Sequence, residues 1–184
     1  MGATLWNLER KELVKQFPVD HDTVRVAQFT PDGRHLILAS VDDKAIRVFD
    51  VETRRLVTQV VNDHYVTTVM ALSSNGRHLV SGGGWRPNPF TREGDYAIRR
   101  WQLPETVGSN QGSQTHPIRL VRQYAGHRAA VHEVRIAPDG KFAVSVSENG
   151  SVSAWELATG RELQQFKQHT APVYSVDIAR DNRT

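Results

Sequence analysis

The stretch VHEVRIAPDGKFAVSVSENGSVSAW, residues 131–155, decides the fold of this chain. It contains three short segments in which apolar and polar residues alternate, a pattern that favours β-strands and lacks the period of a helix. Turn residues separate the segments. In Pro138-Asp139-Gly140 the proline presets φ and the glycine supplies a left-handed residue, which is typical of a tight hairpin. The stretch therefore predicts an antiparallel sheet in which neighbouring strands are joined by short turns.

The same pattern recurs along the chain and defines a repeat. A histidine precedes each first strand, and the repeat length is 43 residues from His21 to His64 and 42 from His127 to His169. Four strands follow each of the first three histidines, and the third of these strands ends on an aromatic residue. The predicted first strands are 24–29, 66–72, 131–136 and 173–178; the second, 35–40, 78–82 and 142–147; the third, 46–49, 98–101 and 152–155; the fourth, 56–61, 118–124 and 163–166.

Units of four strands repeating every 40–45 residues or so are typical of propeller blades. The chain resembles the WD40 repeat family, with Gly126-His127 before a first strand and Phe49-Asp50, Trp101-Gln102 and Trp155-Glu156 where the family has Trp-Asp. The resemblance implies an all-β fold, a WD40-type β-propeller arc of four-stranded antiparallel blades. The expected units are the end of a partial blade at 1–19, blades at 20–62, 63–125 and 126–167, and the start of a truncated blade at 168–184.

The two ends of the chain do not contain whole units. Residues 5–8 match the end of a third strand, residues 13–17 match a fourth strand, and residues 173–178 match only a first strand. We therefore expect about three full blades with partial blades at both ends, as a segment of a larger propeller protein. Exposed strand edges and apolar blade faces also predict self-association.

Histidine and acidic residues recur at a fixed spacing. Asp43 follows His21 by 22 residues, Asn149 follows His127 by 22, and Asp95 follows His64 by 31, which is 22 plus a nine-residue insertion. The family resemblance implies that these residues form a structural hydrogen-bond network with the aromatic residue of the third strand, joined by a strand hydroxyl such as Ser40 or Ser147. A catalytic His–Asp dyad is the alternative, but an active site does not need one copy per blade. The expected network residues are His21, Asp43, Phe49, His64, Asp95, Trp101, His127, Asn149 and Trp155.

The remaining histidines are expected to be exposed strand or loop residues, and no metal site is expected, because histidines on separate blades do not converge on one ion. These histidines are His35, His78, His116 and His132.

Two insertions lengthen the unit 63–125. The insertion at 84–94 joins the second and third strands at the end of the blade that carries the histidine loops, which the resemblance implies is the usual docking face. The insertion at 104–117 is rich in Gly, Ser, Gln and Asn and is expected to be a flexible spacer at the opposite end. Aromatic and arginine side chains are enriched at interface hot spots, although the aromatic residues of the first insertion could equally pack back on the blade. The candidate partner-binding residues are Trp85, Arg86, Phe90, Arg92, Tyr65 and Arg128.

Composition excludes several other classes of function. The chain has no cysteine, which removes thiolate metal sites and cysteine nucleophiles, and its 23 basic residues against 20 acidic ones are scattered without a nucleic-acid footprint. No apolar run is long enough to span a membrane, and no catalytic sequence motif is present. We therefore expect a cytoplasmic, non-catalytic protein–protein interaction scaffold without cofactors, whose partner is a protein or peptide. The alternative is a propeller accessory domain of a larger enzyme, such as a kinase or peptidase.

Overall fold

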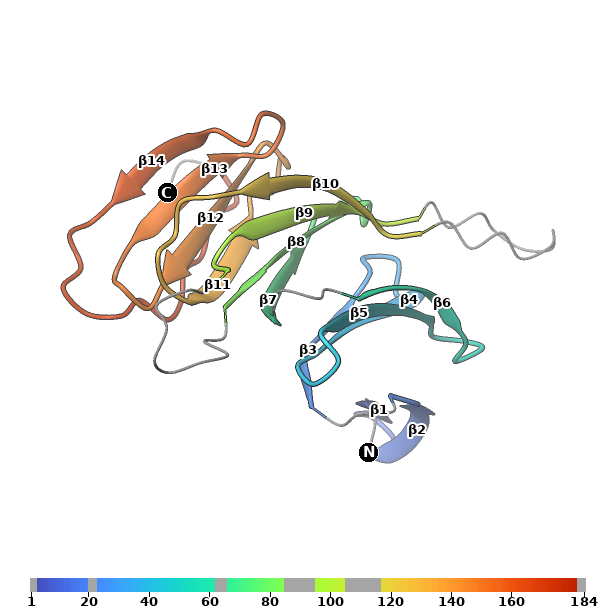
Figure 1. The fold of residues 1–184 in the computed structure, drawn as a ribbon. Helices are drawn as coiled ribbons and strands as arrows, with labels where there is room; N and C mark the ends of the chain where they lie inside the picture. The colour runs from blue at the N-terminus through green and yellow to red at the C-terminus, as the bar shows by residue number, and fades with distance from the viewer. Residues whose placement is uncertain (1–2, 20–22, 62–65, 85–94, 105–116, 182–184) are drawn as a thin grey trace.

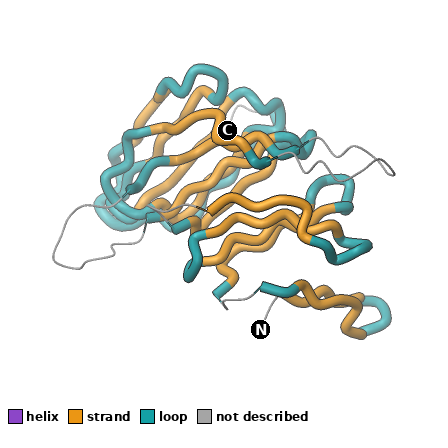
Figure 2. Tube along the Cα trace, turned by 45° about the vertical axis from the view of Figure 1, so that its right-hand side comes forward, coloured by secondary structure: helices purple, strands orange, loops and turns teal. Residues whose placement is uncertain are grey.

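The computed structural model describes residues 3–19, 23–61, 66–84, 95–104 and 117–181. Every regular element in these ranges is a β-strand, and the strands form four separate antiparallel sheets (Figure 2). The predicted all-β, four-stranded architecture is therefore confirmed. Among the described residues there is no helix that is long and apolar enough to cross a membrane.

Three of the sheets have four strands each and follow chain order (Figure 1). Blade 1 contains β3 (Val24–Phe29), β4 (His35–Ser40), β5 (Ala45–Asp50) and β6 (Leu56–Val61). Blade 2 contains β7 (Thr67–Leu72), β8 (His78–Gly83), β9 (Ile98–Gln102) and β10 (Arg119–Tyr124), and blade 3 contains β11 (Val131–Ile136), β12 (Phe142–Ser147), β13 (Val152–Glu156) and β14 (Glu162–Phe166). The fourth sheet pairs only β1 (Ala3–Asn7) with β2 (Glu12–Phe17).

The first turn of each blade shows why the sequence folds this way. Gly33, Gly76 and Gly140 have φ of 70°, 70° and 71°, the left-handed region that a glycine adopts without steric cost. Each of these amides donates to the carbonyl three residues earlier. The hairpins predicted from the proline, asparagine and glycine residues therefore fold as local turns, and they fix the register of the first two strands.

The blades pack face to face, with the first strands innermost. Strand β7 contacts both β3 and β11, and the fourth strands lie on the outside. Apolar clusters fill the layers between the sheets: Phe17, Leu36 and Phe49 lie between the β1–β2 sheet and blade 1; Ile37, Leu79 and Trp101 between blades 1 and 2; Val80, Val134 and Trp155 between blades 2 and 3. The sheets form an arc and do not close on themselves.

One predicted strand is absent. Residues 173–178 form no strand, although the amide of Val176 donates to Oε2 of Glu133 at 2.9 Å and the amide of Val173 donates to the carbonyl of Ser147 at 3.3 Å. The segment thus lies beside β11, where a first strand of a following blade belongs. It forms no ladder because no second strand among the described residues pairs with it, and alternation alone does not make a strand.

Candidate functional site

The candidate site of blade 3 is a chain of hydrogen bonds around His127, which is only 8% exposed, and this chain reaches the surface at Asn149. Nε2 of His127 lies 2.6 Å from Oγ of Ser145, and Nδ1 lies 3.0 Å from Oγ of Ser151. The indole Nε1 of Trp155 donates to Oγ of Ser145 at 2.8 Å, and Oγ of Ser151 donates to Oδ1 of Asn149 at 2.7 Å. The sequence-predicted residues His127, Asn149 and Trp155 are thus brought together through two serines.

The donors and acceptors of this chain assign the state of the ring. Since the hydroxyl of Ser151 donates its hydrogen bond to Asn149, its oxygen accepts a hydrogen bond from Nδ1–H of His127. Nε2 of His127 then accepts a hydrogen bond from the hydroxyl of Ser145. All the donors and acceptors of this hydrogen-bond chain have a partner only when the His127 ring is neutral. Burial lowers the pKa of His127 to about 4, in agreement with this pattern.

In blade 1 the expected Ser40 hydrogen-bonds to Asp43, whereas in blade 3 the structure corrects the identity of the strand hydroxyl. Ser147, one of the two expected candidates, donates instead to the carbonyls of Ala129 and Ala130, both at 3.0 Å. Ser145 joins His127 and Trp155 because it lies two residues nearer the start of β12, diagonally across from Trp155, which pairs with Ala143. Sequence reasoning also missed Ser151.

In blades 1 and 2, an ion pair stabilises the turn between the second and third strands. In blade 2 the indole of Trp101 donates to Oγ of Ser81 at 2.8 Å, and Asp95 pairs with Arg99. In blade 1, Asp43 pairs with Arg47, which holds the pKa of the Asp43 carboxyl below its ordinary value. His21 and His64 lie outside the described residues.

Where a blade lacks one residue of this network, the residue that would have paired with it is replaced as well. Phe49 has no N–H to donate, and an apolar residue, Leu38, occupies the position of Ser81 and Ser145. Asn149 cannot form an ion pair, and Ser153 stands where blades 1 and 2 have Arg47 and Arg99. Because the amide of Asn149 is neutral, its hydrogen bonds have no charge assistance. The structure adds that the arginine is replaced too, so no cation is left unpaired at that turn.

The catalytic alternative finds no support in this geometry. Ser145 is fully buried and His127 nearly so, and both are held between the strands of one blade. A nucleophile must reach its substrate, and Ser145 has no path to one. No group of three or more His, Asp or Glu side chains that could hold a metal occurs in the part of the chain that the structure describes.

The network fixes two loops at one end of blade 3. The amide of Glu148 donates to the carbonyl of Ala130 at 2.9 Å, and Ser147 binds the same loop. Arg128 and Glu148 are exposed on these loops. At the neighbouring turn of blade 2, Gly84 lies against Tyr96 and Ala130, so any Cβ there would meet the Tyr96 ring at 2.5 Å. We call the loops 126–130 and 148–150 with the flanks Gly84 and Asp95 the His127 platform.

One of the six candidate partner-binding residues, Arg128, lies in the described part of the chain, where it is exposed. The other five lie outside the described residues, as does 105–116 of the second insertion: Tyr65, Trp85, Arg86, Phe90 and Arg92. His116 is outside as well. The prediction that the other histidines are exposed is wrong for His35, which is 7% exposed, and His78 and His132 are half-buried because the adjoining blade and the 173–178 segment cover them.

Repeated four-stranded blades stacked in an arc define a propeller-type repeat protein. The WD40 family model, described as "WD domain, G-beta repeat", matches residues 11–50 and 118–156. Each match starts at a fourth strand and runs through the first three strands of the next blade. The chain therefore contains WD40 repeats, which serve in general as scaffolds for protein interactions and not as catalytic units.

Several proteins share short stretches of similar sequence with this chain. Ribosome biogenesis protein ERB1 of Yarrowia lipolytica is 33% identical over 66 residues, and that of Saccharomyces cerevisiae is 43% identical over 61 residues. WD repeat-containing protein 36 of Homo sapiens is 27% identical over 55 residues. These stretches cover 36%, 33% and 30% of this chain and 8%, 7% and 6% of the respective relatives. The chain thus spans less than a tenth of the length of the curated relatives that it matches.

Proposed function

We propose that this chain is a non-catalytic scaffold and part of a larger propeller protein, and that it binds a protein or peptide on the His127 platform. The observation that supports this most is the closed hydrogen-bond chain of His127, which holds two loops in one geometry while Arg128 and Glu148 stay exposed. Rigid loops lose little entropy on binding, and exposed arginine is favoured at interfaces. The aromatic and arginine residues at 85–92 would extend this surface, as the sequence predicts.

Site-specific photo-crosslinking tests the platform. A photoreactive amino acid at Arg128 should form a discrete adduct in cells, and excess unlabelled chain should compete it away. The same excess of an Arg128→Glu, Trp85→Ala chain should not compete. Gln123, exposed on the outer strand β10, is the matched control position. An adduct of equal yield at Gln123, or none at Arg128, would contradict the proposal.

We do not extend the proposal to ribosome assembly. The stretches shared with the ERB1 proteins are about one and a half repeats long, and repeats of one family resemble each other whatever their partners. The cytoplasmic location predicted from the sequence remains a prediction, which fractionation of cells that express the whole gene product would test.

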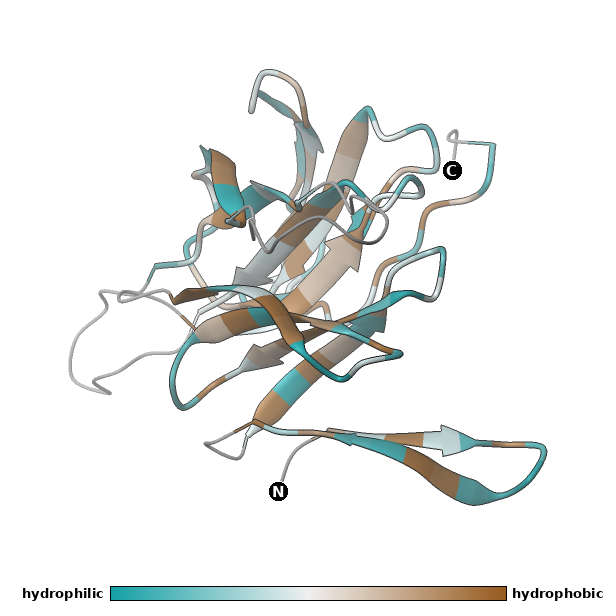
Figure 3. Ribbon diagram, turned by 90° about the vertical axis from the view of Figure 1, so that its right-hand side faces the viewer, coloured by the Kyte–Doolittle hydropathy of each residue, from teal (hydrophilic) through white to brown (hydrophobic). Residues whose placement is uncertain are grey.

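We also propose that the isolated chain self-associates through its blade edges and apolar faces. Trp6 is 56% exposed and Leu8 87% exposed on the β1–β2 hairpin, and Leu120 on β10 is 50% exposed. Figure 3 shows hydrophobic bands on the hairpin next to the N-terminus. Sedimentation velocity should show a weight-average mass that rises with concentration. A monomer of 20.7 kDa at every concentration would refute this proposal.

A further inference from the structure

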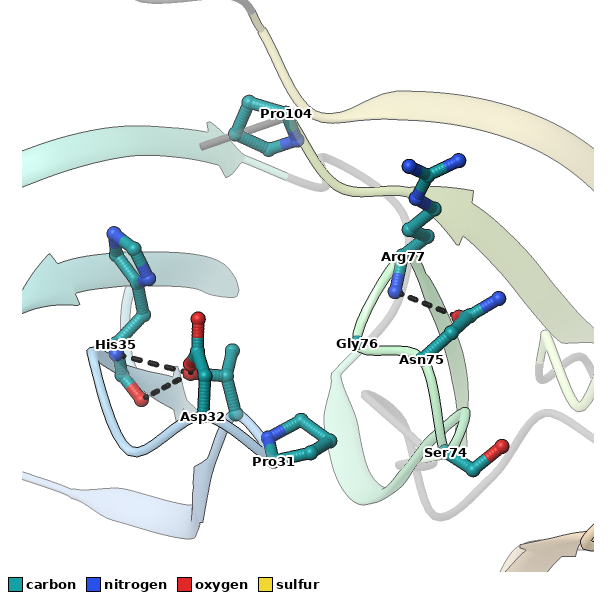
Figure 4. A pocket seen from close by; sticks show the side chains of 9 residues that line it. Pro31, Asp32, His35, Ser74, Asn75, Gly76, Arg77 and Pro104 are labelled. Atoms are coloured by element: carbon teal, nitrogen blue, oxygen red, sulfur yellow. Dashed lines mark hydrogen bonds between the residues drawn. The ribbon is translucent and has the colours of Figure 1, made fainter. Parts of the chain in front are cut away.

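A recess lies between the first turns of blades 1 and 2, at the opposite end of the blades from the His127 platform. Its volume is about 310 Å³, the lower end of the range for ligand sites. Gly76 packs against Pro31, where a Cβ would meet the proline ring at 3.2 Å, so the two turns touch. Figure 4 shows Asp32 and His35 on the blade 1 side, Asn75 and Arg77 on the blade 2 side, and Pro104 between them.

The wall formed by blade 1 has a buried polar atom without a hydrogen-bond partner and an exposed carboxylate. His35 is 93% buried, and Nδ1 of its ring has no hydrogen-bond partner among the described residues. A buried ring nitrogen without a partner is unfavourable unless a ligand supplies one. Asp32 lies at the mouth of the recess. Its bonds from Thr30 and from the amide of Arg34 hold the pKa of its carboxyl below the ordinary value, so it carries a negative charge at neutral pH.

At the other two junctions, side chains of the preceding sheet cap a main-chain carbonyl of the following blade. Between the β1–β2 sheet and blade 1, Nζ of Lys15 donates to the carbonyl of Val51 at 2.6 Å. Between blades 2 and 3, the guanidinium of Arg100 and the hydroxyl of Tyr124 donate to the carbonyl of Leu157 at 2.8 and 3.0 Å. Val51 and Leu157 are equivalent, because the amide of each donates to the residue after the first-turn glycine of its blade. At both junctions a cation of the preceding sheet thus caps the carbonyl that follows the third strand.

At the junction between blades 1 and 2, blade 1 has no lysine, arginine or tyrosine at the equivalent positions of its described strands. Strand register puts Thr58, Val48 and Val60 at the positions of Lys15, Arg100 and Tyr124. The equivalent carbonyl is that of Leu103, directly before Pro104. The recess is therefore found at the junction where the preceding blade supplies no cation at these positions, although Arg77 of blade 2 lines the recess.

We propose that this recess binds one cationic side chain, lysine or arginine, of a partner polypeptide. Asp32 holds the charge at the mouth, and Nδ1 of His35 accepts a hydrogen bond further in. Arg77 opposes the cation from the blade 2 side but has interactions of its own. The site goes beyond the proposed function, since it lies at the other end of the blades and does not depend on the His127 platform.

The test uses the whole chain labelled with ¹⁵N and the peptide acetyl-Gly-Arg-Gly-amide, with acetyl-Gly-Gln-Gly-amide as the neutral control. The arginine peptide should shift the amide resonances of Gly33 and Gly76 in a saturable manner, and the glutamine peptide should not. Asp32→Asn should weaken binding about threefold to fivefold, as expected for a partly exposed ion pair. Folding should tolerate this change, because blade 2 has Asn75 at the same position of its turn, where its side chain accepts the same amide bond.

Two further variants make the outcome decisive. Asp139→Asn removes the same charge from the equivalent turn of blade 3 and should leave binding unchanged, whereas Arg77→Gln should strengthen it. Equal losses of affinity in Asp32→Asn and Asp139→Asn would show that the effect depends only on the net charge of the protein, and would overturn the proposal. Loss of binding in Arg77→Gln would also overturn it, because the peptide would then be held through Arg77 and not through Asp32. The absence of a saturable shift with the arginine peptide would refute the proposal directly.

Discussion

Acidification should destabilise this protein through His127. The ring is neutral in the folded state, with its pKa lowered by burial to about 4 from the ordinary 6.5. The unfolded chain therefore binds the proton more readily, and the free energy of unfolding falls as pH drops below about 6.5 and levels off below about 4. The difference of about 2.5 pKa units corresponds to about 3 kcal/mol at full effect, and the same linkage gives about 2 kcal/mol at pH 5.

Urea unfolding from pH 7.5 to pH 4.5 measures this loss, and a His127→Gln variant separates it from the other groups. Carboxyls such as Asp43 and Asp50, with lowered pKa values, lose their contribution only below their ordinary pKa of 3.8. Between pH 7 and pH 5 the wild type should therefore lose about 2 kcal/mol more than the variant. An NMR titration of the His127 ring checks the cause directly. A pKa near 6.5 for His127, or parallel pH profiles of the two proteins, would refute the reasoning.

Three further predictions concern stability, each measured by urea unfolding at pH 7.5. Ser145→Ala should cost about 3 kcal/mol, because it leaves ring nitrogens of two buried residues without a partner; a loss below about 1 kcal/mol would contradict the network. Asp43→Asn should lower the free energy of unfolding by about 1–2 kcal/mol, because it leaves Arg47 without its ion-pair partner. Adding Arg47→Ser, which reproduces the blade 3 combination, should recover part of this loss; strictly additive effects of the two substitutions would argue against the pairing. Gly83→Ala should cost more than about 3 kcal/mol, because its Cβ would lie 2.2 Å from the carbonyl oxygen of Val66, whereas Gly140→Ala, in open space at φ 71°, should cost about 1 kcal/mol; equal costs would contradict the close approach.

The repeat could be predicted from sequence because its signals are local. Alternation within six residues and a glycine in each first turn determine a hairpin without reference to the rest of the chain. The segment 173–178 shows the limit of such signals. It alternates like the other first strands, but a strand needs a hydrogen-bonded neighbour, and alternation does not report whether that neighbour exists.

The site was only partly predictable because it depends on geometry between strands. Constant spacing linked His127 to Asn149 and Trp155, but Ser145 and Ser147 share one face of β12, and only the pairing of Ala143 with Trp155 selects Ser145. Burial of His35 depends on the packing of blade 2 against blade 1, which no pattern within blade 1 reveals. Residues that cover each other across a junction are separated by a whole repeat in sequence.

The capped carbonyls of Val51 and Leu157 bear on how such an array can grow. The acceptor at each junction is a main-chain oxygen, so the receiving blade contributes no particular side chain, and only the donating blade must keep a lysine, arginine or tyrosine. Coupling between neighbours in a repeat protein is set at such interfaces. If a blade were duplicated and inserted into the array, the following blade would already present the main-chain carbonyl that accepts its hydrogen bond. Mutations could then change every side chain just after the third strand of that following blade without removing this hydrogen bond.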